Sequence, residues 1–97
     1  MATGQGTVTF NFGAAPGTNI VTTAVTGQAS IGSGSKVEIY MMGTDSTATH
    51  NAYEHAILPL DLALSCTSIT AGTGFTAQAA TTQRLTGTIQ ARWVFAD

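Results

Sequence analysis

The strongest constraint on this chain is a strict alternation of side chains along its last segment. Between Leu85 and Phe95, the odd-numbered positions carry Leu, Gly, Ile, Ala, Trp and Phe, whereas most of the intervening positions carry Thr, Gln or Arg. A period of two residues places successive side chains on opposite faces of a β-strand, and it does not fit one face of a helix. The segment therefore predicts a long strand with one buried face.

Shorter segments of the same kind precede it, separated by turn residues rich in Gly and Pro. They predict strands near residues 8–12, 21–25, 36–42, 58–65, 66–70 and 75–79. No segment shows a convincing helical period over three turns. We therefore expect an all-β chain, with residues 1–97 forming a single-domain antiparallel β-sandwich or jelly roll of about 7–8 strands, and residues 1–6 a flexible N-terminal arm.

Charge is scarce, with 3 basic and 5 acidic residues among the 97. An ordinary soluble domain has roughly 25% charged residues. Three basic side chains are too few for a nucleic-acid footprint or for an anionic membrane surface. The longest uncharged central stretch, residues 62–83, is too rich in Thr, Ser, Gly and Gln to span a bilayer as a helix. The composition therefore excludes nucleic acid and membrane as expected partners.

A surface with so few charged residues also affects whether the protein associates with itself or with a partner. Thr, Ala, Gly and Ser together supply 50 of the 97 residues. Where Lys and Glu would normally protect exposed strand edges from pairing, this chain has Thr, Ser and Gln. We therefore expect a homo-oligomer, or a protein whose edges are covered by a partner.

One segment gathers titratable side chains: His50, Glu54 and His55. Two imidazoles and a carboxylate could hold zinc, but the spacing does not match the inverted zincin motif, and that motif requires a helix. The alternative is that Glu54 pairs with one histidine or with nearby backbone and fixes a loop. We expect no metal ion and no other cofactor.

Nucleophilic catalysis has little support. Cys66 is the only cysteine, which excludes an internal disulfide and a cysteine-based zinc site, and we expect its thiol to be packed in the fold. The serines at 33 and 35 do not form a Gly-x-Ser-x-Gly elbow. We expect no enzyme, with a small metal-dependent enzyme built on the histidine segment as a distant alternative.

Several short motifs together resemble a group of small tailed-bacteriophage proteins of about this length. They are Val25-Thr26-Gly27-Gln28, Lys36-Val37-Glu38, His50 to His55, Ala71-Gly72-Thr73-Gly74-Phe75, Leu85-Thr86-Gly87 and Trp93-Val94-Phe95. The resemblance implies a virion structural protein assembled in the host cytoplasm. Among such proteins, the chain is similar to capsid decoration, or cement, proteins, which bind the assembled shell and stabilise it. The alternative role that the resemblance implies is a tail or fibre module for host recognition.

This interpretation implies contacts with the major capsid protein or with other virion proteins. The expected contact regions are the N-terminal arm, the loop from Gly43 to His55 and the outward face of the last strand. The side chains that we expect at such an interface are Thr3, Gln5, Met42, His50, Tyr53, His55 and Arg92.

Overall fold

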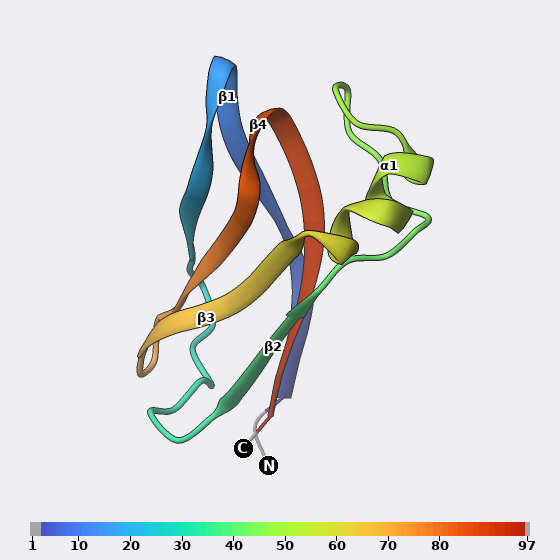
Figure 1. Cartoon of the computed structure of the whole chain (residues 1–97). Coiled ribbons are helices and arrows are strands. Elements are labelled where there is room, and N and C mark those ends of the chain that lie inside the picture. The colour runs from blue at the N-terminus through green and yellow to red at the C-terminus, as the bar shows by residue number, and fades with distance from the viewer. Residues whose placement is uncertain (1–2, 97) are drawn as a thin grey trace.

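The computed structural model describes residues 3–96 and consists mainly of antiparallel strands (Figure 1). Its elements in chain order are β1 (Thr3–Val25), β2 (Lys36–Tyr40), the helix α1 (Ala52–Ile57), the 3-10 helix η1 (Leu58–Leu60), β3 (Leu62–Thr70) and β4 (Gly74–Ala96). All pairings are antiparallel and belong to one sheet. The all-β class predicted from the alternation is confirmed.

β4 is the centre of the sheet. On one side it pairs with β1 along nearly its whole length, from Thr3 opposite Ala96 to Val25 opposite Phe75. On its other side, β2 pairs with the carboxyl end of β4 and β3 pairs with the amino end. The alternating segment 85–95 is the carboxyl-terminal half of this central strand.

The predicted number of strands is wrong: residues 3–96 form four strands rather than seven or eight. The segments 8–12 and 21–25 are both parts of β1, 58–65 and 66–70 both fall on β3 (with residues 58–60 in η1), and 75–79 and 85–95 are both parts of β4. Gly13 and Gly87 lie opposite each other with φ angles of 82° and 78°, and the register shifts on either side of this pair. β1 therefore bends where a loop was expected, whereas β4 bends at Gly87, inside the segment 85–95 that was expected to be one strand.

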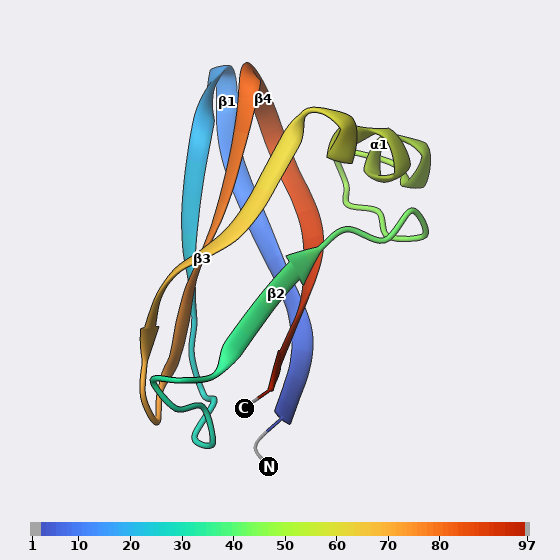
Figure 2. The same cartoon turned by 60° about the horizontal axis from the view of Figure 1, so that its bottom comes forward.

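The bend returns the sheet on itself. Figures 1 and 2 show β1 and β4 running side by side to one end of the molecule and then back along it. The first half of the sheet consists of residues 3–12 of β1, residues 88–96 of β4, and β2. The second half consists of residues 18–25 of β1, residues 74–85 of β4, and β3. Aromatic residues from both halves of the sheet meet in one core.

The core consists of inward-facing side chains, and it includes side chains of the buried face that the alternation predicted for residues 85–95. Its members are Val8, Phe10, Phe12, Ile31, Ile39, Leu62, Phe75, Ala77, Ala79, Ile89, Ala91, Trp93 and Phe95. Two glycines of β1 make room for large rings on β4. A Cβ placed on Gly4 would lie 2.2 Å from the ring of Phe95, and one on Gly6 would lie 2.6 Å from the ring of Trp93. The rings thus cover β1 where it has no side chains.

The segment 52–60 was expected to be irregular and then to enter a strand, and here the sequence prediction is wrong. Residues 52–57 form α1 and residues 58–60 form η1, so β3 begins only at Leu62. Asn51 starts α1 with a capping box: its Oδ1 accepts from the Glu54 N–H at 2.9 Å, and Glu54 Oε1 accepts from the Asn51 N–H at 3.0 Å. No helix in residues 3–96 is long and apolar enough to cross a membrane.

Candidate functional site

The site begins with a gap beside β4. On the side away from β1, β2 pairs with β4 only from Ala96 to Arg92, and β3 pairs with it only from Gly74 to Thr81. Between these points the N–H and C=O groups of β4 have no strand partner on that side within residues 3–96. Backbone groups that lie near a core need hydrogen-bond partners from another source.

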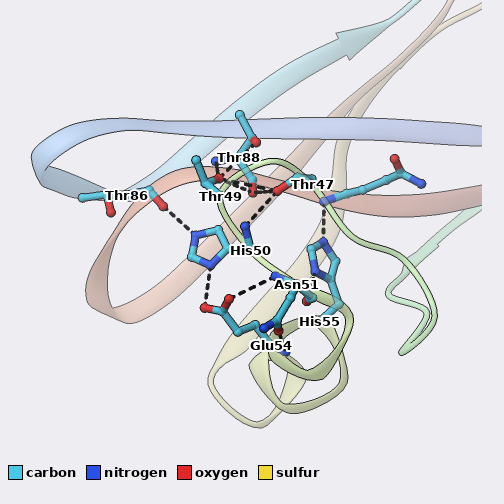
Figure 3. Close-up of polar contacts among 9 residues, drawn as sticks. Thr47, Thr49, His50, Asn51, Glu54, His55, Thr86 and Thr88 are labelled. Carbon is cyan, nitrogen blue, oxygen red and sulfur yellow. Dashed lines mark hydrogen bonds and ion pairs between the residues drawn. The ribbon is translucent and has the colours of Figure 1, made fainter.

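Side chains of the segment Thr47–His55 fill this gap (Figure 3). Thr49 Oγ1 accepts from the N–H of Thr88 at 2.9 Å, and Thr47 Oγ1 donates to the Thr88 carbonyl at 2.6 Å. His55 Nε2 accepts from the N–H of Gln90 at 3.0 Å. Hydroxyls and imidazoles therefore take the place of a missing strand along residues 86–90.

His50 links this segment to α1 and to β4 at the same time. Its Nδ1 lies 2.9 Å from Glu54 Oε2, and its Nε2 lies 2.7 Å from the carbonyl oxygen of Thr86. Both partners are acceptors, so both ring nitrogens donate when the imidazole is protonated. The predicted pairing of Glu54 with a histidine is present, and it fixes this loop against the bend of β4.

The environment of His50 favours its charged form. Burial opposes protonation, but the hydrogen bonds to the Thr86 carbonyl and to Glu54, with the charge of Glu54, outweigh it, so the pKa of His50 is raised. The hydrogen bond from His50 and the backbone N–H of Asn51 lower the pKa of Glu54. When His50 is protonated, the two groups form an ion pair between the residue that precedes the N-cap of α1 and the first turn of the helix.

His55 has a different role. Its side chain is fully buried, Nδ1 donates to the carbonyl of Asn51 at 2.9 Å, and Nε2 accepts from the N–H of Gln90. These partners require the tautomer with its proton on Nδ1. His55 was expected at an interface; the structure places it inside the loop instead, where it joins α1 to β4.

The two imidazoles do not converge on one point that a metal could occupy. Each ring nitrogen already has a protein partner, and coordination would have to break those hydrogen bonds. Among residues 3–96 no group of three or more His, Cys, Asp or Glu side chains is arranged to hold a metal ion. The arrangement supplies backbone hydrogen bonds and no open coordination site.

A second ion pair lies beside this segment. Arg92 binds Asp45 through both Nε and Nη2, at 3.0 and 2.7 Å, and the Asp45 side chain is buried. The hydrogen bonds and charge of Arg92 lower the pKa of Asp45. Arg92 was predicted at an interface, but its guanidinium is held by this internal partner. Nothing in the sequence pointed to Asp45, because the two residues are far apart in the chain.

The remaining predicted contact residues are exposed. Thr3 and Gln5 lie at the start of β1, paired with the end of β4, so residues 3–6 of the expected flexible arm are strand residues here; Met1 and Ala2 lie outside the described residues. Gln5 lines a shallow hollow of about 270 Å³ that also borders Arg92. Met42 is 39% exposed and Tyr53 is 72% exposed.

Tyr53 belongs to an apolar surface that sequence analysis missed. Ile57 is 43% exposed and Leu60 is 92% exposed; Ile57 follows Tyr53 by four residues and Leu60 follows Ile57 by three, which are helical spacings. We call these three side chains the α1–η1 face. The spacing was visible in the sequence, but the alternate leucines from 58 to 64 suggested a strand instead.

Cys66 does not have the surroundings of a nucleophile. Its side chain is partly buried in β3, and its thiol donates to the Ser68 carbonyl at 3.4 Å. Burial raises the pKa of the Cys66 thiol, which disfavours the reactive thiolate. The packing role expected for this residue agrees with its position.

Comparison with known proteins assigns the chain to no family: no protein-family model, no curated protein and no solved structure matches it. Its function must therefore follow from its own side chains. These give a polar cluster with internal partners and an apolar face exposed to solvent.

Proposed function

We propose that this protein is a non-catalytic structural component of a tailed-bacteriophage particle, and that it acts as a capsid decoration protein. The observation that carries the proposal is the exposed α1–η1 face. Tyr53, Ile57 and Leu60 are exposed apolar side chains at helical spacing, and the histidine and glutamate side chains of the same segment are engaged in internal hydrogen bonds. Large apolar side chains that are exposed close together in the chain are typical of an interaction surface.

The geometry of this face favours a helix-in-groove contact. The three side chains stand at positions i, i+4 and i+7, which is the spacing by which a short helix anchors in an apolar groove. The capping box at Asn51 and the bond from His50 to the Thr86 carbonyl hold α1 in one orientation. Such preorganisation reduces the entropic cost of binding.

We propose that the α1–η1 face binds in a groove on the major capsid protein. A standard protein interface buries about 800 Å² on each partner. Three side chains on a single short helix present much less than this, so two copies meeting through this face alone would bury too little surface. A larger partner that surrounds the helix can add contacts from its own walls.

Stabilisation of the shell then follows from mass action. A protein that binds only the assembled lattice stabilises each site by RT ln(1 + [L]/Kd), or about 2.7 kcal/mol at a concentration 100 times Kd. This role requires no active site. It agrees with the resemblance of the sequence to small virion proteins.

We also propose that the folded-over sheet be classified as a β-sandwich. The two halves of the sheet contribute rings to one core, as the contact of Phe75 with Trp93 illustrates. β1 and β4 each belong to both halves, so the sandwich is made by bending one sheet. A solved structure with the two halves about 10 Å apart would support this classification.

The test of the function uses phage particles that lack this protein and are reloaded with purified chain. Wild-type protein is expected to raise the temperature at which DNA is released and to bind in hundreds of copies per particle. Leu60→Ser combined with Ile57→Ser is expected to weaken binding at least tenfold, because two anchors are lost. The matched control is Ile20→Ser, which changes an exposed isoleucine on β1, 58% exposed, and should bind like wild type.

Two results would contradict the decoration role. Particles that bind only three, six or twelve copies would place the protein in the tail, baseplate or fibre. Unchanged heat resistance at full occupancy would show that binding does not stabilise the shell.

A further inference from the structure

One edge of the sheet has no cover in the structure. β1 pairs with β4 on one side, and on its other side no strand among residues 3–96 pairs with it. In an antiparallel pair, every second residue directs its N–H and C=O away from the partner strand. The outer edge of β1 therefore presents a row of backbone donors and acceptors whose natural partner is another extended strand. The Thr7 carbonyl on this edge already accepts from Trp93 Nε1 at 3.2 Å, and a carbonyl oxygen can accept a second hydrogen bond.

The regular part of this edge is Thr3–Asn11. Over these nine positions the register with β4 is continuous, from Thr3 opposite Ala96 to Asn11 opposite Thr88. The irregular register that could block pairing begins only after Asn11. A typical strand in a globular protein has about 5–6 residues, so this edge is long enough for a complete strand pairing.

The edge also has no charge to keep other strands away. No Lys, Arg, Asp, Glu or His occurs in the first 35 residues of the chain. Proteins usually protect free edges with charged residues, proline or bulges. The gap beside β4 is protected in another way: the side chains of Thr47, Thr49, His50 and His55 make hydrogen bonds with its backbone groups. The outer edge of β1 has no such cover within residues 3–96. β3 also pairs only with β4, but its register is interrupted between Cys66 and Ser68, whereas that of β1 is continuous from Thr3 to Asn11.

We propose that this edge binds the same edge of a second copy of the chain, antiparallel and across a two-fold axis. The contact would join the two first halves into one sheet with the order β2-β4-β1-β1-β4-β2. A closed two-fold contact uses the same patch on both subunits, and two identical strands related in this way are antiparallel.

A second copy suits this edge because of the residues that would meet. Full overlap of Thr3–Asn11 with itself centres the axis on Thr7, so that Thr7 faces Thr7, Gln5 faces Thr9, and Thr3 faces Asn11. All five of these side chains are exposed and uncharged. Polar pairs of this kind stabilise neighbouring strands, and no like charges are brought together. This interface lies on a different element from the α1–η1 face and does not depend on the proposed function.

The experiment measures self-association of the purified full-length chain by sedimentation velocity over a range of concentrations. A dimer is expected, with amide hydrogen exchange in Thr3–Asn11 slowing as the dimer forms. Thr7→Lys alone and Thr7→Glu alone should each weaken the dimer about tenfold, because like charges meet at the axis. A mixture of the two variants should restore it, which also shows that both variants fold.

The matched control is Ser65→Lys, which places the same charge on an exposed position of β3, another strand that pairs only with β4. This variant should dimerise like wild type. A wild-type chain that stays monomeric up to about 1 mM overturns the proposal. So does a dimer that Thr7→Lys leaves intact, or that Ser65→Lys weakens equally, or that the Lys and Glu mixture fails to restore.

Discussion

Phe75 and Trp93 lie in the same strand and yet meet edge to face, with ring centroids 5.3 Å apart and ring planes at 78°. They are 18 positions apart in sequence (93 − 75), and a straight strand would separate them by about 60 Å. The contact exists because β4 bends near Gly87 and returns. The core of this protein is therefore made largely by one strand packing against itself.

This contact predicts a large loss of stability for Phe75→Ala. Phe75 is 4% exposed and joins the two halves of the sheet, so its removal leaves a cavity at their interface. We expect the free energy of unfolding to fall by about 3–5 kcal/mol in urea denaturation. Ile20→Ala is the control, since Ile20 is 58% exposed, and should change stability by less than about 1 kcal/mol. A similar loss in both variants would contradict this account of the core.

Gly6 predicts a second effect on packing. A Cβ at this position would lie 2.6 Å from the indole of Trp93, whose Nε1 donates to the Thr7 carbonyl at 3.2 Å. Gly6→Ala should therefore displace the ring and cost about 1–3 kcal/mol, with a changed tryptophan fluorescence spectrum. Gly34→Ala, where a Cβ meets nothing within 4 Å, should leave both the spectrum and the stability nearly unchanged.

The cover of the β4 gap can be tested at Thr49. Thr49→Val keeps the shape of the side chain but removes the hydroxyl that accepts from the N–H of Thr88. We expect a loss of about 1–3 kcal/mol and faster amide exchange at Thr88, because its N–H loses its partner. Thr49→Ser retains the hydroxyl and should retain the slow exchange. Equal exchange in the valine and serine variants would show that the hydroxyl does not protect this edge.

The His50–Glu54 pair predicts a pH dependence. The pKa of His50 is raised in the fold, so its protonation stabilises the folded state; this contribution is complete below its ordinary pKa of about 6.5 and is lost as pH rises through the folded value. The pKa of Glu54 is lowered, so its contribution is present above its ordinary value and is lost as pH falls through the folded value. Stability from this pair should therefore be greatest between the two ranges.

Urea denaturation between pH 5 and pH 8.5 checks this dependence. Wild-type stability should decline over the upper part of the range, and His50→Gln should flatten the decline. Glu54→Gln is the matched variant, because Gln preserves the capping box while removing the charge that raises the pKa of His50. It should reduce the slope without abolishing it, since the Thr86 carbonyl remains. An unchanged slope in His50→Gln would refute the assignment.

Sequence reasoning succeeded where the signal is local and long. The alternation that ends in Trp93 and Phe95 identified a long strand and its buried face, and the grouping of His50, Glu54 and His55 indicated that Glu54 pairs with one histidine or with nearby backbone. It failed at α1, because six helical residues are too few to show a period, and the leucines that follow imitate a strand. The strand number was wrong because Gly13 and Gly87 bend continuous strands.

The partners of the loop were not predictable from sequence for a different reason. Thr86, Thr88 and Gln90 offer backbone groups, which carry no signature of residue type. Whether those groups are free depends on where β2 and β3 stop along β4. Only the three-dimensional register reveals that the threonines and histidines have backbone partners 35 to 41 positions away.

The pairing of Thr3 with Ala96 joins positions that are 93 residues apart (96 − 3), and this separation governs how the chain can fold. β1 is synthesised first, but its partner β4 is complete only after all other elements have been made. At about 5–20 residues per second, β1 waits on the order of seconds for that partner. Contacts so distant in sequence also slow folding in solution. Delayed pairing of an uncharged first strand therefore makes the speed of synthesis, as much as final stability, a determinant of the yield of soluble protein.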